Sequence, residues 1–134
     1  MITTGEMGRI IALKCKEIGI KLVKQADNLQ DGEINEEQIV VIPKAENTGR
    51  IWSRAAVEVN ILVPNKRKDI LDLQRLYDLE RKAKQVFTHR SVGTADGTLY
   101  RYSYESIGRI SSATLRCGWI NVKINFEYLN TKEK

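Results

Sequence analysis

A change of hydrophobic period between Ala56 and Phe87 constrains the fold of this chain more than any other feature. Over the first eight residues, aliphatic and polar side chains alternate, which is the period of a strand with one buried face. The buried set would be Val57, Val59, Ile61 and Val63. Pro64 then has no N–H to give to a sheet, and Asn65 can cap a helix.

The remainder of this unit has the period of a helix that begins at Lys66. Its apolar residues form one stripe, made of Ile70, Leu73, Leu76, Tyr77, Leu79, Ala83, Val86 and Phe87. The sequence therefore predicts a strand that leads directly into an amphipathic helix lying on a sheet. The substitution Leu76→Asp should unfold the protein, because it would place an unpaired charge between the helix and that sheet.

The length of 134 residues fits a single domain with one hydrophobic core. Apolar residues make up 42% of the chain and charged residues 29%, as in an ordinary soluble domain. No apolar run approaches the ~20 residues needed to span a bilayer, and residues 1–6 lack the pattern of a signal peptide. We expect a protein that is made and kept in a cytoplasm and has no membrane partner.

The rest of the chain predicts one more helix and several strands. A helix capped by Thr3 or Thr4 should run from Gly5 to Ile18 and end at Gly19. Strands are expected at 20–24, 38–43, 50–63, 98–106 and 113–128, with a bulge or bend at Gly118 near the start of the last strand. Polar connections are expected at 25–37, 44–49, 88–97 and 107–112. The expected fold class is α+β, with a mainly antiparallel sheet of four to five strands and two helices packed on one face. It forms a single domain, 1–134, whose residues 130–134 should fray.

Groups that could perform catalysis or bind a metal are sparse. His89 is the only histidine and has no partner at ligand spacing, so a surface position is favoured over a catalytic base. Cys15 and Cys117 lie 102 positions apart without ligand spacing. We expect two buried or half-buried side chains, and a disulfide or a reactive thiol is the alternative. The acidic residues between Asp27 and Glu37 do not have the spacing of a calcium-binding loop. The sequence predicts no enzyme, no metal site and no cofactor.

Charge and aromatic patterns leave two functional hypotheses open. The net charge is +5, of which residues 65–92 carry +4, a value consistent with an anionic partner and equally with a solvated helix face. Tyr100, Tyr102 and Tyr104 alternate on one strand, so the chain could be a small basic nucleic-acid-binding domain whose tyrosines stack bases, although packing explains the pattern better. The second hypothesis is an assembly protein with long contact loops, in which Arg50, Trp52 and Arg54 form a subunit interface.

The order of elements resembles that of tail-terminator and tail-completion proteins of long-tailed phages, which act at the head–tail joint. The likeness rests on an N-terminal helix (6–18), a short strand (39–43), a long strand ending in residues 57–63, a mid-chain helix around residues 70–76 and a closing strand pair ending in residues 122–128. It is a pattern of elements, and it contains no signature motif. The chain departs from the pattern at 25–37 and 88–98.

The resemblance implies a structural protein of a phage or prophage that forms a ring, usually of six subunits. Such a ring caps or joins the tail tube and contacts the head connector, and DNA passes through its lumen. The expected lumen or partner contacts are the basic Lys66, Arg67 and Lys68, together with His89 and Arg90. The expected location is the host bacterial cytoplasm during assembly and then the tail or head–tail joint of the virion. The family has no catalytic residues to carry over.

Overall fold

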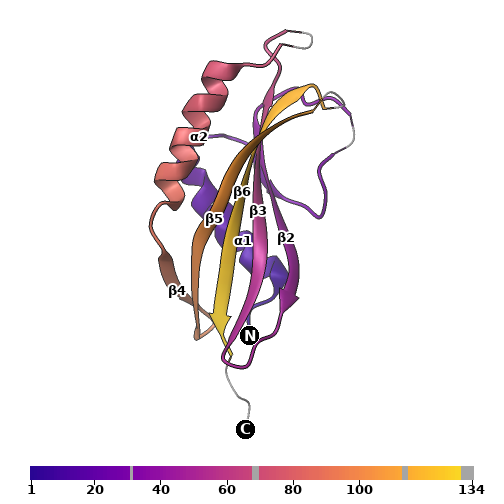
Figure 1. The fold of residues 1–134 in the computed structure, drawn as a ribbon. Coiled ribbons are helices and arrows are strands. Elements are labelled where there is room, and N and C mark those ends of the chain that lie inside the picture. The colour runs from indigo at the N-terminus through magenta and orange to yellow at the C-terminus, as the bar shows by residue number, and fades with distance from the viewer. Residues whose placement is uncertain (31, 68–69, 113–114, 131–134) are drawn as a thin grey trace.

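The computed structural model describes residues 1–30, 32–67, 70–112 and 115–130, and the side chains of 110–112 are not described. The chain forms an α+β fold with one six-stranded sheet in the order β1-β2-β3-β6-β5-β4 (Figure 1). The strands are β1 (Val23–Gln25), β2 (Gln38–Asn47), β3 (Trp52–Pro64), β4 (Ser91–Ala95), β5 (Thr98–Ser112) and β6 (Cys117–Leu129). The helices are α1 (Thr4–Cys15), the short 3-10 helix η1 (Lys16–Ile18) and α2 (Leu73–Phe87).

The sheet has more strands than the four to five expected from the sequence, and it is mixed. β4 lies in the segment expected to be a flexible connection, and it forms a hairpin with β5 through Asp96 and Gly97. Both turn residues have positive φ, as a two-residue hairpin turn requires. β1 pairs parallel with β2, and every other strand pair is antiparallel.

Two further boundaries differ from the sequence prediction. β5 continues through residues 107–112, which were expected to form a turn, because β6 pairs with it as far as Ser112. The bulge expected at Gly118 is absent from β6, which keeps its register there with both neighbours, and lies instead in β5 between Tyr104 and Ser106. Asn130, the first residue of the tail that was expected to fray, is hydrogen-bonded: its N–H donates to Ile51 O, and its Oδ1 accepts from Ser53 Oγ. Residues 131–134 lie outside the described part of the chain.

Both helices pack on the same face of the sheet, as expected. Thr3 caps α1 in a capping box with Glu6, and Gly19 ends the helical region in the left-handed conformation. The main core lies between this face and the helices. It includes Met7, Ile11 and Cys15 of α1, Leu76, Leu79, Ala83 and Phe87 of α2, Val57, Val59, Ile61 and Val63 of β3, and Ile120, Val122, Ile124 and Phe126 of β6.

α2 begins seven residues later than the sequence predicts. Asp72, and not Asn65, caps the helix, and its carboxylate accepts from Arg75 N. Before it, Lys66 N donates to Ile70 O and Ile70 N donates to Arg67 O. Ile70, Leu73 and Tyr77, which were placed on the buried stripe, are 50%, 46% and 46% exposed. Within the described residues, no helix is long and apolar enough to span a membrane.

No helix of the described residues packs on the opposite face of the sheet. At one end it is covered by the segment before β2, where Ile34 packs against Val40, Leu62 and Cys117 in a second, smaller core. The rest of this face is formed by polar and aromatic residues that alternate with the core residues of β3, β5 and β6. We call this uncovered region the open face; it includes Trp52, Arg54, Glu58 and Asn60 of β3, Asn121, Lys123, Asn125 and Glu127 of β6, and Arg101 and Ser103 of β5.

Candidate interaction surfaces

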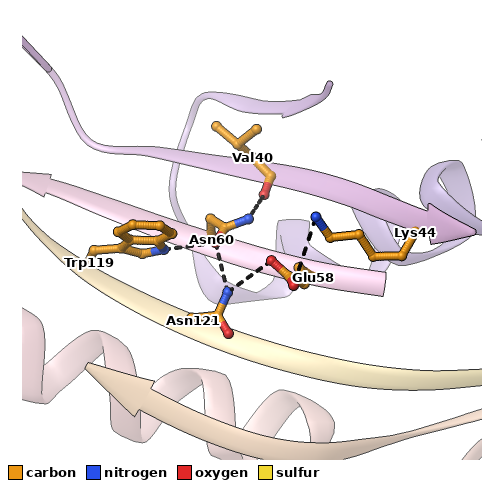
Figure 2. Close-up of polar contacts among 6 residues, drawn as sticks. All are labelled: Val40, Lys44, Glu58, Asn60, Trp119 and Asn121. Atoms are coloured by element: carbon orange, nitrogen blue, oxygen red, sulfur yellow. Dashed lines mark hydrogen bonds and ion pairs between the residues drawn. The ribbon is translucent and has the colours of Figure 1, made fainter. Parts of the chain in front are cut away.

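The open face is anchored by a hydrogen-bonded cluster around Asn60, which is fully buried in the central strand β3. Asn60 Nδ2 donates to Val40 O at 3.2 Å. Its Oδ1 accepts from Trp119 Nε1 at 2.7 Å and from Asn121 Nδ2 at 2.8 Å (Figure 2). The Asn60 amide thus joins β2, β3 and β6, and both its nitrogen and its oxygen have hydrogen-bond partners in this low-dielectric position.

Glu58 continues this cluster toward solvent. Its carboxylate accepts from Asn121 Nδ2 at 3.4 Å and lies 4.0 Å from Lys44 Nζ (Figure 2). Lys44 is on β2 and its side chain is 48% exposed, so the ion pair contributes little to stability. The arrangement orders polar side chains on a sheet surface and brings no nucleophile or general base together.

The expected subunit-interface residues lie at the other end of the open face. The Arg101 guanidinium stacks over the Trp52 ring at 3.9 Å and bonds Glu127 at 3.0 Å. Arg54 lies 3.4 Å from the same carboxylate. Two of the three residues, Trp52 and Arg54, therefore belong to one ordered cluster, and Arg101 and Glu127 are members that the sequence did not single out. Their pairing depends on the β3–β6–β5 register, which no local pattern reveals.

Arg50 stands apart from this cluster. It is exposed in the connection between β2 and β3. This connection lies at the same end of the sheet as the last residues of β6 (Figure 1). Main-chain contacts tie this connection to the end of β6, because Asn130 N donates to Ile51 O.

The expected basic contact residues do not form one surface. Lys66 and Arg67 are exposed at the end of β3 opposite to Trp52, about 40 Å away along a strand of this length. Arg67 lines a cavity with Arg116 and Glu33, whose side chains are 3.9 Å apart. Lys68 lies outside the described residues.

His89 and Arg90 are exposed after the far end of α2, a helix about 22 Å long, and so lie apart from Lys66. His89 lines a shallow cleft with Lys14 and Glu17 of the α1 region and Lys82 of α2. Lys14 and Lys82 come from separate helices, so the sequence alone does not indicate that they lie near His89.

A third surface lies where α2 meets β5. Arg109 Nε lies 3.3 Å from Glu80 Oε1, and its guanidinium lies 4.7 Å from the centre of the exposed Tyr77 ring. Arg81 and Lys84 line the same hollow. No local pattern in the sequence indicates this cluster, because residues 107–112 were expected to form a turn.

The tyrosine stripe faces the helices. Tyr102 is 6% exposed, and its ring stacks on Tyr100 and Phe126 with centroids 6.3 and 5.9 Å apart. Burial raises the pKa of Tyr102 above its ordinary value. The packing interpretation of the stripe is confirmed for Tyr100 and Tyr102, and Tyr104 is 36% exposed.

Both cysteines are buried and unpaired, as expected. Burial raises the pKa of the Cys15 thiol to about 12 and that of Cys117 to about 11, so both stay protonated at neutral pH. Across the described ranges, no group of three or more His, Cys, Asp or Glu side chains is placed to hold a metal ion.

Comparisons with known proteins establish the fold and no more. No protein-family model matches the chain, and no curated protein matches it. Several solved structures match, and one of them is similar with a TM-score of 0.55, over 98% of this chain and 96% of that chain, at 11% sequence identity. At this identity the similarity concerns the arrangement of helices and strands.

Proposed function

We propose that this chain is a structural protein of the head–tail joint of a long-tailed phage or prophage, a ring-forming tail terminator or tail-completion protein. Its partners are copies of itself, with six chains in the ring, and the proteins of the tail tube and head connector. It works in the host bacterial cytoplasm during assembly and stays in the tail or head–tail joint of the virion. It has no catalytic activity.

The observation that carries this proposal is the order of elements over nearly the whole chain. A capped N-terminal helix, an antiparallel strand pair, a mid-chain helix and a closing strand pair follow one another in α1, β2–β3, α2 and β5–β6. This is the order on which the resemblance to the phage proteins rests. The additional strands β1 and β4 fall in or next to the two segments where the chain departs from that pattern.

The surfaces support a binding role over a chemical one. The ordered groups of the open face are amides, guanidinium groups and carboxylates that already bond one another, which suits a preformed contact surface. In the proposed ring, the open-face cluster around Trp52 and Arg54 faces a neighbouring subunit. Lys66 and Arg67, at the other end of β3, face the lumen or a joint partner, where positive charge favours DNA.

Deleting the gene from a phage or an inducible prophage that carries it tests the proposal. We expect particles with filled heads and tails that are unjoined or of uncontrolled length, seen by electron microscopy after induction. A plasmid copy should restore joined virions, and a copy carrying Leu76→Asp, which unfolds the protein, should not. Normal infectious virions from the deletion strain would overturn the proposal.

The alternative, a nucleic-acid-binding domain with a tyrosine-lined sheet face, is not favoured by the position of Tyr102 between sheet and helices. It predicts a monomer that binds single strands with a steep dependence on salt. Fluorescence anisotropy with a labelled oligonucleotide at low and high salt measures this directly. Tight, salt-sensitive binding by a strict monomer would support it against the ring.

A further inference from the structure

The outer edge of β5 has no strand partner over most of its length. β4 pairs with β5 only from Thr98 to Tyr102, whereas β5 continues to Ser112. Figure 1 shows β4 beside only the lower part of β5. From Ser103 on, no strand within the described chain pairs with this edge, so main-chain N–H and C=O groups face outward there. Such an edge is a template for a further strand.

The two edges of the sheet differ in how well they could accept a strand. On the β1 side, β1 covers residues 39–41 of β2, and beyond it Pro43 lacks an N–H. A proline blocks pairing at an edge. Residues 103–109 of β5 contain no proline, the bulge between Tyr104 and Ser106 leaves the strand regular from Ser106 on, and Tyr104, Glu105, Ser106, Gly108 and Arg109 are all exposed. The β5 edge is therefore the accessible one.

The charges on this edge are arranged symmetrically about Ile107. Glu105 lies two positions before it and Arg109 two positions after it. If two copies pair antiparallel with Ile107 opposite itself, the pairing is regular from Ser106 to Gly108, and Glu105, in the bulge at the end of this segment, faces Arg109 of the partner subunit. Opposite charges in directly facing positions stabilise a strand pair, whereas like charges weaken it. Any other partner strand would need to supply this charge pattern, and a second copy already has it.

Arg109 is held in place for this contact. Its guanidinium lies against Glu80 and the Tyr77 ring, so its position is ordered before any partner binds. A guanidinium has five N–H donors, which leaves several for a second carboxylate. Tyr77, which the Arg109 guanidinium covers, is half exposed beside this edge and adds apolar surface to it.

We propose that the β5 edge is a self-association site at which two copies of the chain pair antiparallel across a two-fold axis at Ile107. The two six-stranded sheets then form one continuous sheet, with two Glu105–Arg109 pairs across the junction. This inference does not rest on the proposed ring. A two-fold contact cannot close a cyclic ring, which needs a head-to-tail contact made by a different surface.

Sedimentation equilibrium over a concentration series, with the purified full chain, tests the pairing. The variant Glu105→Lys places two positive charges opposite each other at each end of the junction, and we expect association about tenfold weaker than in the wild type. The matched control is Glu36→Lys, which makes the same change of charge at an exposed residue of the segment before β2. Equal association of wild type and Glu105→Lys, or a wild type that stays monomeric at every concentration, would overturn the inference.

A disulfide trap tests the register without relying on affinity. Ile107→Cys places two thiols across the axis at about 5 Å between Cα atoms, a separation that a disulfide spans. Ser103→Cys, on the same strand, places its two copies roughly 27 Å apart in this register. We expect a covalent dimer on mild oxidation for Ile107→Cys alone. A failure of Ile107→Cys to cross-link beyond the Ser103→Cys level would refute the register. A six-membered ring unaffected by Glu105→Lys would refute the edge contact and leave the ring proposal standing.

Discussion

At the scale of single residues, the polar atoms buried beneath the open face differ in whether their hydrogen bonds are satisfied. Asn60 uses both ends of its amide, as donor to Val40 O and as acceptor from Trp119 and Asn121. Gln38 is also buried, at the start of β2, but its Oε1 has no hydrogen-bond partner in the described part of the chain. The cost of removing a buried polar group depends on this difference.

The substitution Asn60→Leu should lower the free energy of unfolding by about 2 kcal/mol, because it removes three hydrogen bonds and leaves Trp119 Nε1 and Val40 O to find other partners. Urea denaturation followed by far-UV circular dichroism measures the change. Asn125→Leu is the matched control on the same sheet face, since the Asn125 side chain makes none of these bonds. Equal losses in the two variants would show that the Asn60 cluster adds nothing specific.

Gln38→Met, in contrast to Asn60→Leu, should not lower the free energy of unfolding. It replaces a buried amide that has an unsatisfied oxygen with an apolar side chain of similar volume, so we expect unchanged stability or a gain of up to about 1 kcal/mol. The same denaturation experiment compares it with Asn60→Leu. A loss as large as that of Asn60→Leu would mean that Gln38 Oε1 is satisfied in solution.

The two buried thiols should make the free energy of unfolding depend on pH in the alkaline range. The ordinary thiol pKa of 9.0 is raised to about 12 for Cys15 in the folded protein. Above pH 9 the unfolded chain therefore loses the proton first, and stability falls as the pH rises toward 12. Cys117 and the buried Tyr102 contribute in the same direction, because their pKa values are also raised.

Stability measured by urea denaturation near pH 8 and near pH 10.5 tests this. Cys15→Ala should be less stable than wild type near pH 8, because it leaves a small cavity. It should also lose less stability between the two pH values, because one titrating group is gone. An identical pH slope in wild type and variant would contradict the assignment of Cys15 as a buried, protonated thiol.

At the scale of elements, the contact of α2 with β6 depends on Gly118. A Cβ built at this position would meet Leu76 Cδ1, the helix residue that is 2% exposed against the sheet. The absence of a side chain therefore lets the helix approach the strand closely. The sequence signal at Gly118 was real, but it marks close packing and not the bulge that was expected.

Gly118→Ala should lower the stability by about 1–3 kcal/mol through overpacking against Leu76. Leu76→Asp should unfold the protein outright, since it buries an unpaired charge at the same contact. Gly108→Ala, in β5, is the control, because nothing lies within 4 Å of a Cβ there. Differential scanning calorimetry distinguishes the three. Wild-type stability of Leu76→Asp would refute the assignment of the buried helix face.

Some helices and strands of this fold are predictable from the sequence, and others are not. The capped first helix, the β2–β3 pair and the buried residues Leu76, Leu79, Ala83 and Phe87 follow from periodicity and capping. The start of α2 does not, because Ile70 and Leu73 continue the apolar spacing before and across the cap at Asp72. The residue types at 107–112 also give a wrong prediction, because their composition favours a turn, whereas pairing with β6 keeps them in β5.

The candidate surfaces were predictable only in part, for a similar reason. Trp52 and Arg54 were recognised from their position at the start of a long strand. Their partners Arg101 and Glu127 come from strands brought alongside by tertiary pairing, at sequence separations that no local pattern spans. The basic residues were treated as one contact set because they flank α2, but the lengths of α2 and β3 separate them.

At the scale of the whole molecule, the central claim is that the chain assembles into a ring at the head–tail joint. Its described residues offer ordered contact surfaces at both ends of the sheet, and no cluster suited to metal binding. Ring formation depends on a head-to-tail contact between copies, and so on protein concentration.

Multi-angle light scattering after size-exclusion chromatography, over a wide concentration range, tests the claim most directly. We predict a mass that rises with concentration to about six times the 15.3 kDa of one chain, or to a multiple of that mass where rings also pair through the β5 edge. Arg54→Glu in the proposed interface should shift that rise to higher concentration, and Glu36→Lys should not. A mass of 15.3 kDa at every concentration, or one that stops at two chains, would contradict the ring.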